Sequence, residues 1–130
     1  MIESSAFLRR AIQADAIFSG ASAVILTIGE IAPLLNLPEA LLRETGLFLV
    51  AYAALVGWLG TRPVMPKILV AIVIAGNAAW ALASIALLFS SAVAPNLLGE
   101  AAIAMQAIVV GVLAELQFVG LRRGSSTVAV

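Results

Sequence analysis

Four long apolar stretches constrain this chain more than any other feature of its sequence. They cover about residues 11–29, 38–61, 67–90 and 97–121. A helix rises about 1.5 Å per residue and needs roughly 20 apolar residues to cross about 30 Å of hydrocarbon. Because lipid offers the backbone no hydrogen bonds, such segments must be helical. We therefore predict an all-α integral membrane protein, a four-transmembrane-helix bundle forming one domain over residues 1–123, with a flexible tail over 124–130.

The composition excludes most soluble and catalytic classes of protein. Of the 130 residues, 63% are hydrophobic and 11% are charged, whereas a soluble domain has about 25% charged residues. The chain contains no Cys and no His, so it lacks the usual ligands of zinc, haem and iron–sulfur clusters and the parts of a Ser-His-Asp triad. We predict no metal, no cofactor and no catalytic residue. The net charge of zero predicts no nucleic-acid partner.

The basic residues predict how the spans are oriented. Six of the seven precede the first span, lie between the second and third, or follow the fourth: Arg9, Arg10, Arg62, Lys67, Arg122 and Arg123. The opposite side carries mostly acidic residues. By the positive-inside rule, the basic side is cytoplasmic, and both termini lie there. The same bias argues against an antiparallel dimer of dual topology.

The second span reaches full length only if its helix begins near Pro38. Asn36 would then cap the helix, and Pro38 would occupy its first turn. Glu39 and Arg43 would form an i,i+4 ion pair at the membrane interface. We therefore expect this helix to start well before its most apolar part.

A shift of 62 residues aligns the first span with the third. Eight of the 27 positions from Ile12 to Pro38 are identical to the residue 62 positions later, where about three identities are expected by chance. Asp15 is aligned with Asn77. The pattern favours two parallel helix-hairpin repeats, related by a pseudo-two-fold axis along the membrane normal. The alternative is that apolar helices of similar composition align by chance.

Polar side chains inside the spans are the candidate functional residues, because they are costly to place in lipid. Asp15 in the first span and Glu115 in the fourth are ionisable. The amides are Asn77 in the third span and Gln106 and Gln117 in the fourth. A purely structural alternative is that the two carboxylates reach nearby arginines and only fix the helix register.

Depth suggests that several of these residues form one layer. Asp15 and Asn77 each precede a proline of the outer turns by 18 residues, and Glu115 follows Asn96 by 19. At about 1.5 Å per residue, all three lie roughly 27–29 Å below these turns. With Tyr52 about one turn away, they would line a cytoplasm-facing cavity for a proton, a cation or a small polar solute. The face of the fourth span that holds Glu115 is then the inward one.

Several short motifs with polar or aromatic residues lie within the spans and beside them: Leu8-Arg9-Arg10-Ala11, Ala14-Asp15-Ala16, Thr61-Arg62-Pro63, Asn77-Ala78-Ala79-Trp80, Ala114-Glu115-Leu116-Gln117-Phe118 and Gly120-Leu121-Arg122-Arg123. In these segments, residues 8–123 resemble a group of small four-span bacterial inner-membrane proteins without an assigned activity. The architecture is also similar to that of DoxX-like four-helix membrane proteins. The resemblance implies a multi-pass protein of the bacterial inner membrane and supplies no mechanism.

Two classes of function remain open. Short loops and small-residue helix faces favour a non-catalytic accessory, assembly or structural subunit, which self-associates as a homo-oligomer or packs on a larger membrane complex. The polar layer favours the alternative, a small oligomeric transporter or channel with a carboxylate site. An enzyme is the most distant possibility, because only carboxylates, hydroxyls and Tyr52 could perform chemistry. The expected partners are the lipid bilayer and other membrane subunits or further copies of this chain.

Overall fold

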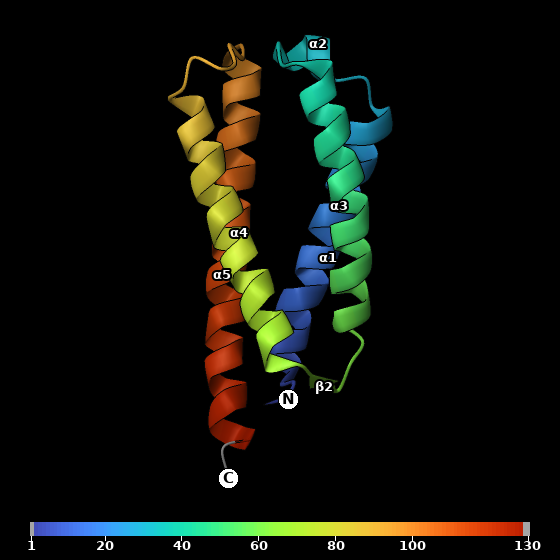
Figure 1. Ribbon diagram of the computed structural model, residues 1–130, viewed down its shortest axis with the longest axis vertical. Coiled ribbons are helices and arrows are strands. Elements are labelled where there is room, and N and C mark those ends of the chain that lie inside the picture. The colour runs from blue at the N-terminus through green and yellow to red at the C-terminus, as the bar shows by residue number, and fades with distance from the viewer. Residues whose placement is uncertain (1, 129–130) are drawn as a thin grey trace.

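The computed structural model describes residues 2–128, in which four long helices run along a common axis (Figure 1). These helices are α1 (Ala6–Ile28), α3 (Glu39–Leu59), α4 (Lys67–Leu88) and α5 (Leu97–Val128). Each is long and apolar enough to cross a membrane. The predicted spans and the helical bundle agree with this architecture. Helix α5 continues through part of the segment predicted as a tail, of which residues 129 and 130 lie outside the described range.

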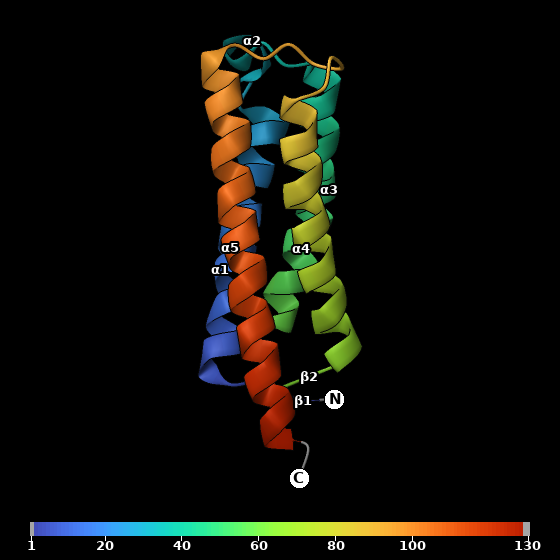
Figure 2. The same cartoon turned by 90° about the vertical axis from the view of Figure 1, so that its left-hand side faces the viewer.

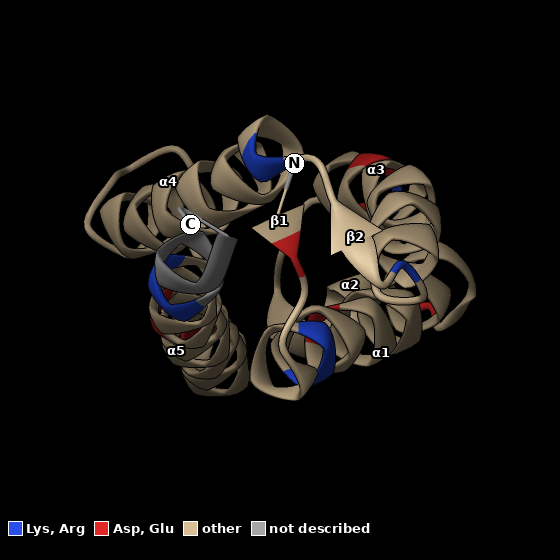
Figure 3. Cartoon of the chain, turned by 90° about the horizontal axis from the view of Figure 1, so that it is seen from below, with Lys and Arg blue, Asp and Glu red and all other residues tan. Residues whose placement is uncertain are grey.

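Small elements close the two ends of the bundle. A short helix, α2 (Ala32–Leu35), connects α1 to α3 at one end. At the other end, β1 (Ile2–Glu3) pairs antiparallel with β2 (Val64–Met65). Figure 3 looks onto this second end, where Lys and Arg residues, in blue, lie on the helices around the two strands.

Residues at the helix ends explain where α1 begins and why the predicted cap of α3 is wrong. Helix α1 starts after Ser5, whose Oγ accepts a hydrogen bond from the backbone N–H of Leu8 at 3.0 Å. The predicted ion pair between Glu39 and Arg43 is confirmed. The predicted cap at Asn36 is wrong, because this residue ends α2 in the left-handed conformation with φ 54°. A short polar side chain tolerates that conformation better than most residues do.

The helices form two hairpins that meet on one side only. Helix α1 packs along α3, α4 packs along α5, and α1 also packs on α5, whereas α3 and α4 do not pack along each other. Figure 1 shows the two hairpins close together near β1 and β2 and further apart toward α2, and Figure 2 shows α4 and α5 side by side. Two asparagines bridge the outer turns. Asn36 donates to the carbonyl of Ala94 at 2.6 Å, and Asn96 donates to that of Leu34 at 2.7 Å.

Two separate hydrophobic cores hold the hairpins together. The lower core lies near β1 and β2 and contains Ile2, Leu8, Ile12, Val56, Leu59, Met65, Val70, Val73 and Leu121. The upper core lies near α2 and contains Ala32, Leu35, Leu37, Leu42 and Ile103. The region between these two cores is where the polar residues of the spans gather.

Candidate functional site

Asp15 lies at the centre of a buried polar cluster to which all four long helices contribute. Its side chain is only 1% exposed. Ser19, one turn further along α1, donates to Oδ1 at 3.0 Å. Oδ2 accepts three hydrogen bonds, from the hydroxyl of Tyr52 on α3 at 2.6 Å, Nδ2 of Asn77 on α4 at 2.8 Å and Nε2 of Gln117 on α5 at 2.9 Å. We call these five residues the Asp15 cluster.

Helical spacing explains how the sequence brings the amides of the cluster together. Asn77 lies one turn from Val73 and one turn from Ala81, and all three are buried on α4. Gln117 lies one turn from Leu113 and one turn from Leu121 on the buried side of α5. Each amide therefore occupies a position in an otherwise apolar stripe that faces the other helices. Nδ2 of Asn77 also donates to Oε1 of Gln117 at 2.9 Å, which joins α4 to α5.

The cluster holds the carboxylate of Asp15 with uncharged groups. In the part of the chain that the structure describes, no Lys or Arg forms an ion pair with Asp15, so the predicted pairing with a nearby arginine is absent there. Hydrogen bonds to a charged group contribute about 1.5–3 kcal/mol each. Four such bonds give the carboxylate a polar surrounding that lipid cannot supply. The cluster therefore fastens the four helices together at one depth.

Glu115 does not join the cluster, and Gln117 occupies the expected position. The side chain of Glu115 is exposed on the surface of α5, whereas Gln117 is 0% exposed. The predicted inward face of this helix is therefore wrong. Depth alone favoured Glu115, but Gln117 lies seven residues after the buried Val110 and three after the buried Ala114. These three positions share one face at i, i+4 and i+7 spacing, but the neighbouring positions of the helix are also apolar, so the sequence alone does not single this face out.

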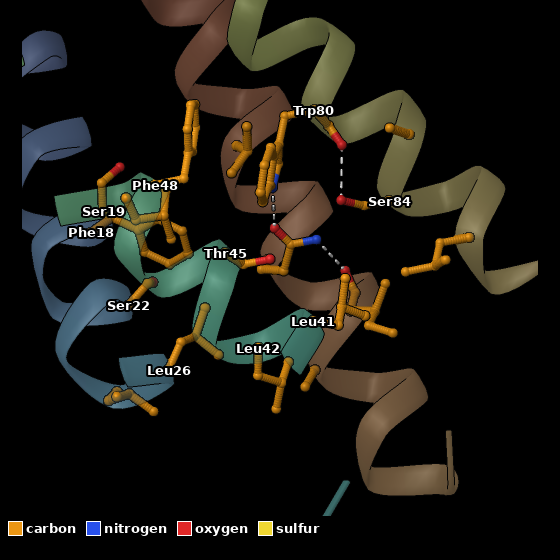
Figure 4. A pocket seen from close by; sticks show the side chains of 18 of the residues that line it. Phe18, Ser19, Ser22, Leu26, Leu41, Leu42, Thr45, Phe48, Trp80 and Ser84 are labelled. Carbon is orange, nitrogen blue, oxygen red and sulfur yellow. Dashed lines mark hydrogen bonds between the residues drawn. The ribbon is translucent and has the colours of Figure 1, made fainter. Parts of the chain in front are cut away.

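A cavity of about 520 Å³ lies between the helices on the α2 side of the cluster. Ser19, Tyr52 and Asn77 form its floor, and Asp15 lies behind them. Figure 4 shows side chains of α1, α3, α4 and α5 around this space. On the opposite side of the cluster, toward β1 and β2, the lower core fills the bundle. The cavity therefore lies on the side away from the basic residues, whereas the sequence predicts it on the side where they lie. The upper core bounds the cavity toward α2.

Aromatic rings form one wall of the cavity. Phe48 of α3 stacks on Tyr52 with ring centroids 6.3 Å apart and on Trp80 of α4 with centroids 6.0 Å apart. The indole N–H of Trp80 donates to Oε1 of Gln106 at 3.0 Å, and Ser84 donates to the backbone of Trp80 at 2.8 Å. These polar groups of the wall are therefore already paired with the protein. The remaining wall is mostly Leu, Ile, Val and Ala.

The side of the cavity between α3 and α4 is the open one. Several of its lining residues on these helices are exposed, including Phe48 on α3 and Gly76 and Ala83 on α4. Because α3 and α4 do not pack along each other, the stacked rings of Phe48 and Trp80 are a main contact between them. An apolar molecule in the bilayer would meet the cavity at this side.

The chemistry that the site offers is hydrogen bonding and the binding of a small molecule. Among the described residues, no group of three or more carboxylates lies close enough together to hold a metal ion. Of the predicted site residues, Asp15, Asn77 and Tyr52 come together and Glu115 stands apart. Comparison of the chain with protein-family models, with curated proteins and with solved structures finds no match.

Proposed function

We propose that this chain is a non-catalytic, multi-pass membrane protein that binds a small, mostly apolar molecule inside its helix bundle. The observation that carries this proposal is the cavity of about 520 Å³ with mostly apolar walls and a polar floor. Pockets for small molecules measure roughly 300–1,000 Å³ and combine apolar walls with a few polar groups. The polar group of the bound molecule would rest on Ser19, Tyr52 and Asn77, and its apolar part would extend between the hairpins.

Binding fits this geometry better than conduction does. A channel needs a continuous polar path, but the lower core below the Asp15 cluster consists of closely packed apolar side chains. Leu8, Ile12, Val56 and Leu59 are all 0% exposed there. A transporter, the alternative suggested by the polar residues, would have to open this core during its cycle. The cavity as it stands has no exit on that side.

The intrinsic fluorescence of Trp80 offers a direct test. The chain has two tryptophans, so Trp58→Phe leaves Trp80, which lines the cavity, as the sole reporter. We expect 4-phenylbutan-1-ol to change the Trp80 emission saturably in lipid nanodiscs. Gly76→Leu should abolish this response, because a Cβ at Gly76 meets nothing within 4 Å and a larger side chain there would fill the cavity.

Ala75→Leu is the matched control, because it adds the same side chain at the next position of α4, which does not line the cavity. This variant should keep the saturable response. A response that is absent in the parent, or equally strong with Gly76→Leu, would count against a binding function.

The accessory-subunit function stays a second candidate, and Glu115 supports it. An exposed carboxylate within a membrane-spanning helix is costly in lipid and is relieved by a polar or basic side chain of another subunit. Native mass spectrometry of the tagged protein, gently extracted from its own membrane, would test this function. A stoichiometric foreign subunit supports an accessory role, and a homo-oligomer alone supports self-association.

The proposal includes an orientation, a location and an origin for the fold. The six basic residues near the β1–β2 end favour a cytoplasmic location for that end and for both termini. The resemblance to small four-span proteins favours the bacterial inner membrane. The 62-residue shift favours an origin by duplication of one helix hairpin. The cavity would then lie toward the outer leaflet.

A further inference from the structure

The hydrogen-bond donors at the floor of the cavity are already in use. The single hydroxyl hydrogen of Ser19 is donated to Oδ1 of Asp15. The two hydrogens on Nδ2 of Asn77 are donated to Asp15 and to Gln117. Tyr52 has one hydroxyl hydrogen and lies 2.6 Å from Oδ2 of Asp15. With Asp15 ionised, these three residues offer no donor to a bound molecule. The hydroxyls of Ser22 and Thr45 also line the cavity, but they lie nearer α2 than the floor does.

Acceptors, in contrast, remain available at the floor. The hydroxyl of Tyr52 lies 3.1 Å from Oδ1 of Asn77 as well as 2.6 Å from Asp15. One hydrogen cannot serve both oxygens, and the carboxylate is the closer and stronger acceptor. Oδ1 of Asn77 and a lone pair of the Tyr52 oxygen are thus left without a hydrogen. Two acceptors side by side favour a partner that brings donors.

We propose that the cavity selects molecules whose polar group donates hydrogen bonds, foremost an amphipathic amine in its ammonium form, and that a proton on Asp15 competes with this binding. The inference rests on the proposed binding function and names its ligand class and its regulation. The negative charge of Asp15 lies directly behind the three floor residues, where it attracts a cation. The rings of Phe48, Tyr52 and Trp80 line the same cavity and offer faces that attract ammonium groups.

Protonation of Asp15 would change the floor without moving a heavy atom. A proton on Oδ2 is donated to the Tyr52 oxygen, and the Tyr52 hydrogen then turns to Oδ1 of Asn77. A proton on Oδ1 is donated to Ser19, whose own hydrogen is released. In both arrangements an acceptor of the floor is consumed and the negative charge is lost. Ammonium binding should therefore weaken as the pH falls.

Asp15 is the group on which this pH dependence rests. The described side chains that face it are Ser19 from α1, Tyr52 from α3, Asn77 from α4 and Gln117 from α5. Of these, only the phenol of Tyr52 can ionise, and an ordinary phenol does so near pH 10. Glu115 is the other carboxylate of this region, and its side chain is exposed on α5 rather than facing the cluster.

A matched set of probes tests the proposal in nanodiscs, with Trp80 as the sole tryptophan. The probes are 4-phenylbutylamine, 4-phenylbutan-1-ol and the methyl ether of that alcohol, which share their apolar part. A primary ammonium stays charged to about pH 10, as a lysine side chain does. We expect the amine to bind at least about tenfold more tightly than the ether at pH 8. The affinity of the amine should fall once the pH is low enough to protonate Asp15, and that of the ether should not change.

Variants separate the role of Asp15 from a general effect on the bundle. Asp15→Asn should weaken amine binding about tenfold and remove its pH dependence, while ether binding is kept. Tyr52→Phe is the second variant, to be used if Asp15→Asn does not fold. It retains the ring and removes an acceptor of the floor, so it should also weaken amine binding. Ser90→Ala is the control, because the Ser90 hydroxyl is bonded to the Leu87 carbonyl and does not line the cavity.

Two kinds of result would overturn the proposal, and they distinguish a failure of the ligand selectivity from a failure of the binding function. Equal binding of the amine, the alcohol and the ether, or an unchanged pH profile in Asp15→Asn, would refute the selectivity for donors while leaving the binding function intact. Saturable binding of none of the three probes would refute the binding function as well.

Discussion

Asp15 and Asn77, which the 62-residue shift aligns with each other, are joined by a hydrogen bond of 2.8 Å in the middle of the bundle. Positions related by a two-fold axis contact each other only where the axis passes between them, so the predicted pseudo-two-fold axis would have to pass through this bond. The packing around it is not symmetric. Helix α1 packs on α5, but the corresponding pair, α4 and α3, stands apart. The open side of the cavity is the side on which this packing is missing.

Asn77→Asp should destabilise the protein by about 3–5 kcal/mol at pH 8, the cost of an uncompensated buried charge. The change places a second carboxylate within hydrogen-bond distance of Asp15. One proton shared by the pair relieves the repulsion, so the folded variant binds more protons than the unfolded chain. Its stability should therefore rise as the pH falls and decrease as the pH rises. Unfolding in mixed detergent micelles at several pH values measures this dependence.

The double variant Asp15→Asn with Asn77→Asp is the control for this experiment. It moves the single carboxylate to the aligned position and should recover part of the lost stability. A double variant no more stable than Asn77→Asp would show that the two positions are not interchangeable.

Gln117→Leu should cost about 2–4 kcal/mol, because it removes bonds to both Asp15 and Asn77 from a fully buried site. Glu115→Gln, two residues earlier and exposed, should change the stability by less than about 0.5 kcal/mol. The same micelle unfolding measurement compares them. A larger effect at Glu115 than at Gln117 would contradict the orientation of α5 described here.

The helices were predictable from the sequence because lipid imposes both their length and their composition. Each predicted span overlaps its helix closely, and only α1 begins earlier, at Ala6, where Ser5 provides a cap. The turn at Asn36 was misjudged because a residue that can cap a helix start can also end the preceding helix in the left-handed conformation. The residues around Asn36 do not indicate whether it caps the following helix or ends the preceding one.

The candidate site was only partly predictable. Asp15, Asn77 and Tyr52 followed from polarity and depth, but choosing between Glu115 and Gln117 required the rotation of α5. Glu115 was chosen because an ionisable residue in a membrane span is a functional candidate. An amide such as Gln117 is less costly to bury and is found more often in a packed helix interface. The position of the cavity depends on how far apart the hairpins lie, which no pattern within one helix encodes.

Gly46 and Gly76 should respond in opposite ways to the same change. A Cβ at Gly46 would lie 2.5 Å from Oγ1 and 3.0 Å from the backbone nitrogen of Thr27, where α3 approaches α1. Gly46→Ala should therefore destabilise the protein by about 1–3 kcal/mol. Gly76→Ala meets no atom within 4 Å and should gain up to about 1 kcal/mol from helix propensity. Micelle unfolding tests the pair, and a loss of stability at both positions would contradict the open space at Gly76.

Reporter fusions should place both termini in the cytoplasm. A green fluorescent protein fused after Val130 should fluoresce, because it folds there, and alkaline phosphatase fused at the same position should be inactive. The phosphatase inserted between Ser90 and Ser91, in the outer turn, should be active. Activity at the C-terminal fusion would reverse the orientation inferred from the basic residues.

Phe48→Ala should widen the opening between α3 and α4. The ring of Phe48 stacks on Trp80 across this side, and such contacts contribute about 0.5–1.5 kcal/mol each. With Trp58→Phe as the background, brominated lipids should quench Trp80 more strongly after the change, because acyl chains reach the cavity more easily. Phe89→Ala is the matched control, since Phe89 is 87% exposed at the end of α4 and does not line the cavity. Unchanged quenching in Phe48→Ala would mean that lipid does not approach Trp80 from this side, and that a bound molecule must enter past the outer turns instead.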